Sequence, residues 1–254
     1  MKILRFLFVF LSCSSFAQKG VKESVQFEKP PVIDGRVDDW PTEWWLDPDG
    51  KFLSNVGNDA ENLYFRLKIS DDLTQQKIAL FGLSLKLNVK GKRKGKVGLK
   101  FPVGKDASEL KREKPEAVES GSDIASKIAI KKLWVSDVEV VELIGLAKQN
   151  IVSSRLGLTN GIEAMLIALD DGSYVYEAKI PFKAFRINKN EVPLLGVEFE
   201  TGRLIVQNKS GNTAYNPTTR VPGSGQQQPR YYYSNYQYNA LTTPGYLWLG
   251  IKLK

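Results

Sequence analysis

The chain has 254 residues and a formal net charge of +8, the composition of a folded, moderately basic protein rather than of a dedicated nucleic-acid binder. It contains no histidine and one cysteine. Catalysis by Ser-His or Cys-His pairs and histidine-held zinc or haem are therefore excluded. Met165 is the only methionine after Met1, so haem held by the usual axial pair is disfavoured further. Carboxylates, tyrosine, lysine, arginine and oxygen-ligated cations remain for chemistry.

Residues 1–17 have the layout of a secretory signal peptide, with two basic residues, an apolar run and a small-residue exit at Ala17. The apolar run is too short for a permanent membrane span, and we expect no transmembrane segment after cleavage. Lipidation of Cys13 is disfavoured, because Phe10 stands where such a cleavage box prefers an aliphatic residue. We expect a secreted, periplasmic or cell-envelope protein.

The mature chain, residues 18–254, has a length that all-β sandwiches commonly reach as one domain. Neither a Ser/Pro-rich linker nor an internal repeat divides it. We therefore predict a single domain.

Residues 30–45, PPVIDGRVDDWPTEWW, hold three of the five tryptophans. Asp34-Gly35 predicts a tight turn, and a second turn follows at Asp38-Asp39. We expect Trp40 to pack in the core near the first strand of the sandwich, because tryptophan buries a large area. Adjacent strand side chains point to opposite faces, so Trp44 or Trp45 should face away from the core. Both are candidate sugar-binding residues.

Residues 62–70 give the clearest strand signal, because apolar and polar side chains alternate there. The pattern predicts one buried face and one solvent face. Further strands are predicted at 83–89, 97–101, 138–146, 162–169, 174–180, 194–199, 204–207 and 246–253. The sequence therefore predicts an all-β fold, an antiparallel β-sandwich of jelly-roll type, with a short helical excursion around residues 106–132.

Residues 91–95, Gly-Lys-Arg-Lys-Gly, should form the tip of a hairpin in a stretch, 73–105, that has no acidic residue. The tip could attract an acidic envelope polymer. Alternatively, its lysines keep an exposed sheet edge from pairing with other chains, and we favour this second interpretation. Nucleic acid is disfavoured, because no aromatic residue interleaves the cations. The cations concerned are Lys92, Arg93, Lys94 and Lys96.

Residues 32–40, 58–72 and 246–248 together resemble the family 9 carbohydrate-binding modules and their DOMON-like relatives. The resemblance implies a jelly-roll β-sandwich that binds sugars, often with structural calcium, in secreted polysaccharide-degrading systems. The positions that match best are Asp59, Asn62, Leu63, Tyr64 and Asp71.

Seven of the ten tyrosines lie between positions 215 and 246. Their setting, residues 208–244, is rich in Gly, Asn, Gln, Ser and Pro and predicts a long loop. Sugar rings present C–H faces that stack on aromatic rings, so this loop is our first choice of ligand surface. The alternative is that the tyrosines pack the loop onto the sheet. The candidate ligand-binding residues are Tyr231, Tyr233, Tyr236, Arg220 and Arg230.

Asp59, Asp71 and Asp72 flank the strand at 62–70 and are candidate ligands of a structural calcium ion, which prefers oxygen donors. Their spacing is not that of an EF-hand loop. The alternative is that they cap turns at the surface.

A glycosidase would need an acid and a carboxylate at a defined separation. Glu163, Glu177, Glu198 and Glu200 are available, but no flanking motif supports catalysis. The sequence therefore favours a secreted, non-catalytic β-sandwich that binds a poly- or oligosaccharide through exposed aromatic residues. The alternatives are a cell-envelope structural or protein-interaction sandwich without sugar binding, and a glycan-active enzyme.

Overall fold

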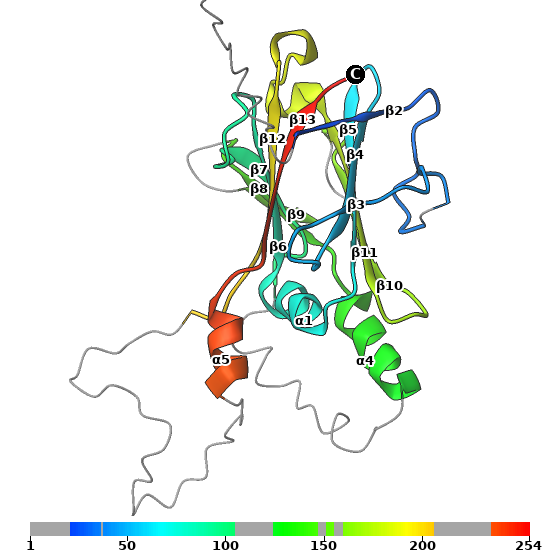
Figure 1. Ribbon diagram of the computed structural model, residues 1–254, viewed down its shortest axis with the longest axis vertical. Helices are drawn as coiled ribbons and strands as arrows, with labels where there is room; N and C mark the ends of the chain where they lie inside the picture. The colour runs from blue at the N-terminus through cyan, green and yellow to red at the C-terminus, as the bar shows by residue number, and fades with distance from the viewer. Residues whose placement is uncertain (1–20, 37, 105–123, 147–150, 155–159, 206–234) are drawn as a thin grey trace, which may run out of the picture.

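Two β-sheets face each other across one hydrophobic core in the computed structural model (Figure 1). The structure describes residues 21–36, 38–104, 124–146, 151–154, 160–205 and 235–254. The predicted all-β sandwich is confirmed. Most neighbouring strands are antiparallel, as predicted, but β1 (Val21–Glu23) runs parallel to β13 (Tyr246–Lys252), and β2 (Val25–Gln26) runs parallel to β4 (Leu53–Asn58).

Sheet A has seven strands and sheet B has six. In spatial order, sheet A comprises β1, β13, β12 (Leu195–Thr201), β6 (Leu83–Asn88), β7 (Val97–Lys100), β8 (Val140–Ile144) and β9 (Ile151–Ser154). Sheet B comprises β10 (Glu163–Ala168), β11 (Tyr174–Pro181), β5 (Asn62–Ile69), β4 and β2, with β3 (Trp45–Leu46) also paired to β4.

The strands predicted from alternation form close to their expected bounds, because apolar side chains at every second position fill the space between the sheets. On β5 the inward side chains Leu63, Phe65, Leu67 and Ile69 are fully buried. Strands β1, β2, β4 and β9 were not predicted. Residues 204–205 lie outside any strand, so the strand predicted at 204–207 is wrong over its described half.

Helices α1 (Asp72–Phe81), α4 (Ile124–Ser136) and α5 (Asn235–Thr242) lie at one end of the sandwich (Figure 1). Two short 3-10 turns, η2 (Phe182–Phe185) and η3 (Lys189–Glu191), follow β11. The helix predicted within 106–132 is confirmed from residue 124 and continues to Ser136. Helix α1 was not predicted, and α5 occupies part of the segment predicted as a long loop.

Residues 27–36 and 38–44, which we call the N-terminal strap, cover the outer face of sheet B. Trp40 is buried, with 5% exposure, but it is absent from the core between the sheets. Its ring meets Phe27 edge-on at 5.0 Å, and Phe27 meets Tyr64 of β5 at 5.5 Å. The expected burial of Trp40 is therefore confirmed and its expected place is wrong. The predicted solvent face of β5 is wrong too, since Tyr64 and Arg66 are each 1% exposed.

Candidate functional site

The β6–β7 hairpin folds back over the outer face of sheet A, where the side chains of β13 hold its tip. The indole N–H of Trp248 donates to the carbonyl of Lys92 over 3.4 Å. The phenol of Tyr246 donates to the carbonyl of Arg93 over 3.1 Å. Two aromatic side chains on one face of one strand thus fix consecutive residues of the tip.

The other side of the tip is held equally closely. The amide of Asn88 donates to the carbonyl of Lys94 over 2.6 Å, and the N–H of Gly95 donates to Oε2 of Glu198 over 3.0 Å. Four consecutive residues, 92–95, therefore each have a backbone group bound to a side chain of the sheet. Residues 92–95, with the flanking Lys90 and Lys96, are called the basic tip below.

Glycine makes this close approach possible at two points. A Cβ on Gly196 of β12 would lie 2.4 Å from the carbonyl oxygen of Lys92. A Cβ on Gly95 would lie 2.3 Å from Cβ of Lys86. Real side chains do not tolerate such distances, so the sequence can seat the tip on the sheet only with glycine at these positions.

Beneath the tip, Lys86 of β6 joins two carboxylates of β12. Its ammonium group lies 3.0 Å from Glu198 and 2.5 Å from Glu200. Burial works to lower the pKa of Lys86, but its hydrogen bonds to Glu200 and Glu198 outweigh burial and raise it. Lys86 is therefore fully charged at neutral pH and neutralises part of the negative charge below the tip.

The strand order tests one of the two interpretations of the basic tip, the protection of an exposed sheet edge. Strands β6 and β7 lie inside sheet A, between β12 and β8, so neither is an edge strand. Our preferred interpretation, that the lysines protect a sheet edge, is therefore wrong. The side chains of Lys92, Arg93, Lys94 and Lys96 are exposed, with Cζ of Arg93 5.5 Å from the centroid of the Trp248 ring.

On the outer face of sheet B, the side chain of Arg66 contacts the rings of two tryptophans of the strap. Its guanidinium carbon lies 3.8 Å from the centroid of Trp44 and 5.0 Å from that of Trp40. The same group donates to Asn55 and to the carbonyl of Pro41. Burial lowers the pKa of Arg66 to about 10, against the opposing charges of Glu177 and Asp39. This cluster holds the strap on sheet B.

Trp44, just before β3, and Trp45, its first residue, have different surroundings. Trp44 stacks on Arg66, whereas Trp45 packs against the core between the sheets. Both are half-buried. Their side chains already make intramolecular contacts, and their predicted contact with sugar stays a prediction.

The predicted metal ligands do not come together. Asp59 precedes β5 and Asp71 follows it, and an eight-residue strand spans roughly 25 Å. Asp59 accepts hydrogen bonds from Tyr64 and from two backbone N–H groups, and Asp71 is the N-cap of α1. Asp72 lies 2.7 Å from the ammonium group of Lys131. Among the described residues no group of three or more acidic or thiol side chains could hold a metal ion.

The tyrosine-rich surface falls mostly outside the described residues. Tyr231, Tyr233, Arg220 and Arg230 lie in the segment 206–234, and Tyr236 belongs to α5. The segment lies in the chain between β12, which carries Glu200, and α5, which precedes β13 and its Tyr246.

Each of the candidate catalytic glutamates already interacts with another group of the protein. Glu163 pairs with Lys179 at the surface. Glu177 is buried under the strap, and Glu198 and Glu200 share Lys86.

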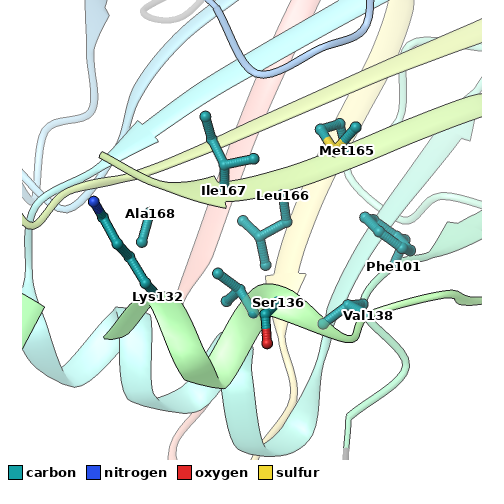
Figure 2. Close-up of a pocket in the computed structure, with 9 residues that line it drawn as sticks. Phe101, Lys132, Ser136, Val138, Met165, Leu166, Ile167 and Ala168 are labelled. Atoms are coloured by element: carbon teal, nitrogen blue, oxygen red, sulfur yellow. The ribbon is translucent and has the colours of Figure 1, made fainter. Parts of the chain in front are cut away.

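A cavity of about 240 Å³ lies between α4 and β10 (Figure 2). Apolar side chains make up most of its wall, including Phe101, Val135 and Leu166. Among the described residues that line it, Lys132 and Ser136 alone are polar, and Lys132 is paired with Asp170. The cavity therefore has few groups for sugar hydroxyls. Within the described residues no helix has the length and apolar character needed to cross a membrane.

Comparison with known proteins gives limited similarity. No protein-family model and no curated protein matches the chain. Among solved structures, a family 9 carbohydrate-binding module from Caldicellulosiruptor kristjanssonii in complex with cellotriose matches at 14% identity, with a TM-score of 0.32. The module in complex with glucose matches at 15% identity and a TM-score of 0.33. Each match covers 70% of this chain and 75% of the other.

Proposed function

We propose that this chain is a non-catalytic carbohydrate-binding protein whose glycan lies on the outer face of sheet A. The observation that carries this proposal is the pair Tyr246 and Trp248. The two rings stand on the same face of β13, about 7 Å apart along the strand. Tyr246 is 41% exposed. The phenol of Tyr246 and the indole N–H of Trp248 each donate to a backbone carbonyl of the basic tip, so the rings are held in place before a ligand arrives.

The neighbouring strand supplies polar partners for sugar hydroxyls. Glu200 lies opposite Tyr246 in the register of β12 and β13, and Ser84 lies opposite Glu200 on β6. Glu200 and Ser84 are partly exposed. Flat aromatic rings beside a few polar groups are a common arrangement for binding an amphipathic ligand such as a sugar.

The carboxylates of this face support binding rather than hydrolysis. Both oxygens of Glu198 are engaged, one by Lys86 and one by Gly95, and the side chain is buried. Glu200 shares the same lysine. A glycosidase acid needs a carboxyl group that can deliver a proton to the scissile bond.

The remaining expectations extend this proposal. The protein would be exported by its signal peptide to the cell envelope or beyond, and residues 18–254 would act as one domain. The tyrosines and arginines of segment 206–234 would add contacts next to Tyr246, since the segment and α5 together make up most of the connection between the two strands of the site. Structural calcium stays part of the proposal at the Asp59 end of β5.

The test is affinity electrophoresis of the purified mature protein on a panel of neutral and acidic polysaccharides, with and without EDTA. We expect retardation on at least one glycan and no turnover. Tyr246→Ala and Trp248→Ala should each weaken binding by about tenfold or more, the effect of roughly 1.4 kcal/mol of lost contact. Leu46→Ala, which changes an exposed apolar side chain of β3 in sheet B, is the control substitution and should leave binding unchanged. Migration of the wild type unaffected by every glycan would refute the proposal.

A second candidate function, protein–protein interaction without sugar binding, is favoured by exposed apolar side chains on α4. Ile124 is 76% exposed and Leu133 is 68% exposed. Ile124→Ser/Leu133→Ser should leave glycan retardation unchanged if sheet A is the functional face.

A further inference from the structure

We infer that the glycan bound on sheet A is anionic, with carboxylate-bearing sugar units, and that the basic tip recognises its charge. The inference rests on the proposed function, because it assigns a ligand class to the surface formed by Tyr246 and Trp248. Three independent features of the tip support it.

First, the tip presents a cluster of cations that have no acidic partner among the described residues. Five basic side chains project from residues 90–96, and all five are exposed. In the part of the chain that the structure describes, none of them forms an ion pair, whereas Lys68, Lys132 and Lys179 of sheet B and α4 each pair with an acidic side chain. The five are Lys90, Lys92, Arg93, Lys94 and Lys96.

Second, the backbone beneath these cations is fixed by the sheet. Side chains of Trp248, Tyr246 and Asn88 bind the three carbonyls of residues 92–94, and Glu198 binds the next N–H. A hairpin whose function was only to stay soluble would not need this anchoring. Because the backbone is already ordered, binding an anion would restrict side chains alone, which lowers the entropic cost of association.

Third, the negative charge under the tip is largely compensated. Glu198 and Glu200 both contact Lys86, whose pKa is raised by those hydrogen bonds despite burial. Glu198 also accepts the N–H of Gly95. The two carboxylates and Lys86 leave one net negative charge, against five cations at the surface, so the local field attracts anions.

The arrangement of Arg93 and Trp248 favours a sugar carboxylate over other anions. The guanidinium carbon lies over the indole ring, 5.5 Å from its centre, so a sugar unit that contacts the ring beside Arg93 lies within reach of the guanidinium. Arginine binds a carboxylate with two parallel hydrogen bonds. A general polyanion site would use the cations without the rings, and a neutral sugar site would use the rings without the cations.

The experiment measures dissociation constants by titration calorimetry for the full mature protein. The probes are oligomers of galacturonate, mannuronate and hyaluronan, each paired with the same oligomer after methyl esterification of its carboxylates. Inorganic polyphosphate is a further probe. The test variant is Lys92→Gln/Arg93→Gln/Lys94→Gln. The matched control is Lys29→Gln/Lys127→Gln/Lys183→Gln, which removes three exposed charges far from the tip.

We expect at least one uronate oligomer to bind about tenfold or more tightly than its ester at low salt, and the difference to shrink as salt rises. The tip variant should lose that difference while binding the ester as the wild type does, and the control should keep it. Trp248→Ala should weaken binding of both forms.

Equal affinity for every acid and its ester would overturn the inference and leave the proposed function standing. Binding of neither form, for all three pairs, would overturn the inference, and the panel of neutral and acidic polysaccharides described above then decides whether the proposed function stands. Polyphosphate bound as tightly as the best uronate, with no effect of Trp248→Ala, would show a general anion site and would also overturn the inference.

Discussion

The indole N–H of Trp40 donates to Oε1 of Glu177 over 3.0 Å, although 137 residues separate the two in sequence. The other oxygen, Oε2, accepts the backbone N–H of Gly35 at 2.8 Å. Glu177 lies on β11 and is fully buried. One carboxylate therefore holds two points of the N-terminal strap on the outer face of sheet B.

This carboxylate should make stability depend on pH. Burial raises the pKa of Glu177 from 4.5 to about 7, helped by Asp39 and Asp34 and opposed by the N–H groups of Gly35 and Trp40. The folded protein thus holds this proton more tightly than the unfolded chain. The contribution of Glu177 to the free energy of unfolding is therefore fully present below pH 4.5 and is lost as pH rises to about 7.

We expect the contribution of Glu177 to the free energy of unfolding to fall by ~1–3 kcal/mol over this interval. Urea denaturation at about pH 5 and about pH 8 measures it, with Glu177→Gln as the comparison because it cannot ionise. The variant should lack this part of the pH dependence. An identical change with pH in both proteins would contradict the role assigned to Glu177.

Removing Trp44 should test whether its ring is structural. Its centroid lies 3.8 Å from the Arg66 guanidinium carbon, and Arg66 is almost fully buried. We expect Trp44→Ala to lower the free energy of unfolding by about 1–2 kcal/mol, whereas Trp44→Phe, which keeps a ring, should cost less. Urea denaturation gives the values. A variant as stable as the wild type but unable to bind glycan would instead restore Trp44 as a ligand residue.

Strand β5 shows which feature a local sequence pattern predicts correctly and which feature it misses. Its alternating apolar residues predicted the inner face correctly, since period-two burial is a local property. The same pattern indicated solvent for Arg66, which is buried by Trp40 and Trp44 of the strap. Such burial depends on a segment distant in sequence, and no local pattern reports it.

The site on sheet A was predictable in parts and not as a whole. The sequence indicated a strand with Tyr246 and Trp248 and a basic hairpin tip, but these lie more than 150 residues apart, and only the strand order brings them together. Strand β4, with the sequence LSNVGN, has weak β-propensity and went unnoticed. Asp71 is a good helix N-cap, a signal that could have revealed α1.

Asp59 offers a test of hydrogen bonding against metal binding. Tyr64 and the N–H groups of Glu61 and Asn62 donate to it over 2.6–2.7 Å. Burial works to raise the pKa of Asp59, but these hydrogen bonds outweigh burial and lower it. Its stabilisation is therefore present above its ordinary pKa of 3.8 and lost as pH falls further.

We expect Asp59→Asn to lower the free energy of unfolding by about 1–2 kcal/mol in EDTA at neutral pH. Chemical denaturation measures the difference. Equal stability of the two proteins in EDTA would contradict the hydrogen-bonding role. A melting temperature that calcium raises in the wild type alone would locate the predicted calcium ion at Asp59.

Gly196→Ala should displace the basic tip without removing Tyr246 or Trp248. It therefore tests whether binding needs the observed position of the tip. The new Cβ would lie 2.4 Å from the backbone oxygen of Lys92, so the tip must move away from β12. We expect a loss of about 1–3 kcal/mol of stability, the usual consequence of overpacking, and weaker binding of uronate oligomers. At Gly245, by contrast, the nearest atom to an added Cβ is a Thr201 methyl at 3.2 Å, so Gly245→Ala should have the smaller effect on both quantities. Thermal melts and calorimetry compare the two variants. Unchanged uronate affinity in Gly196→Ala would mean that the anchored position of the tip is not needed for recognition, because displacement of Lys92 is the change that this substitution forces.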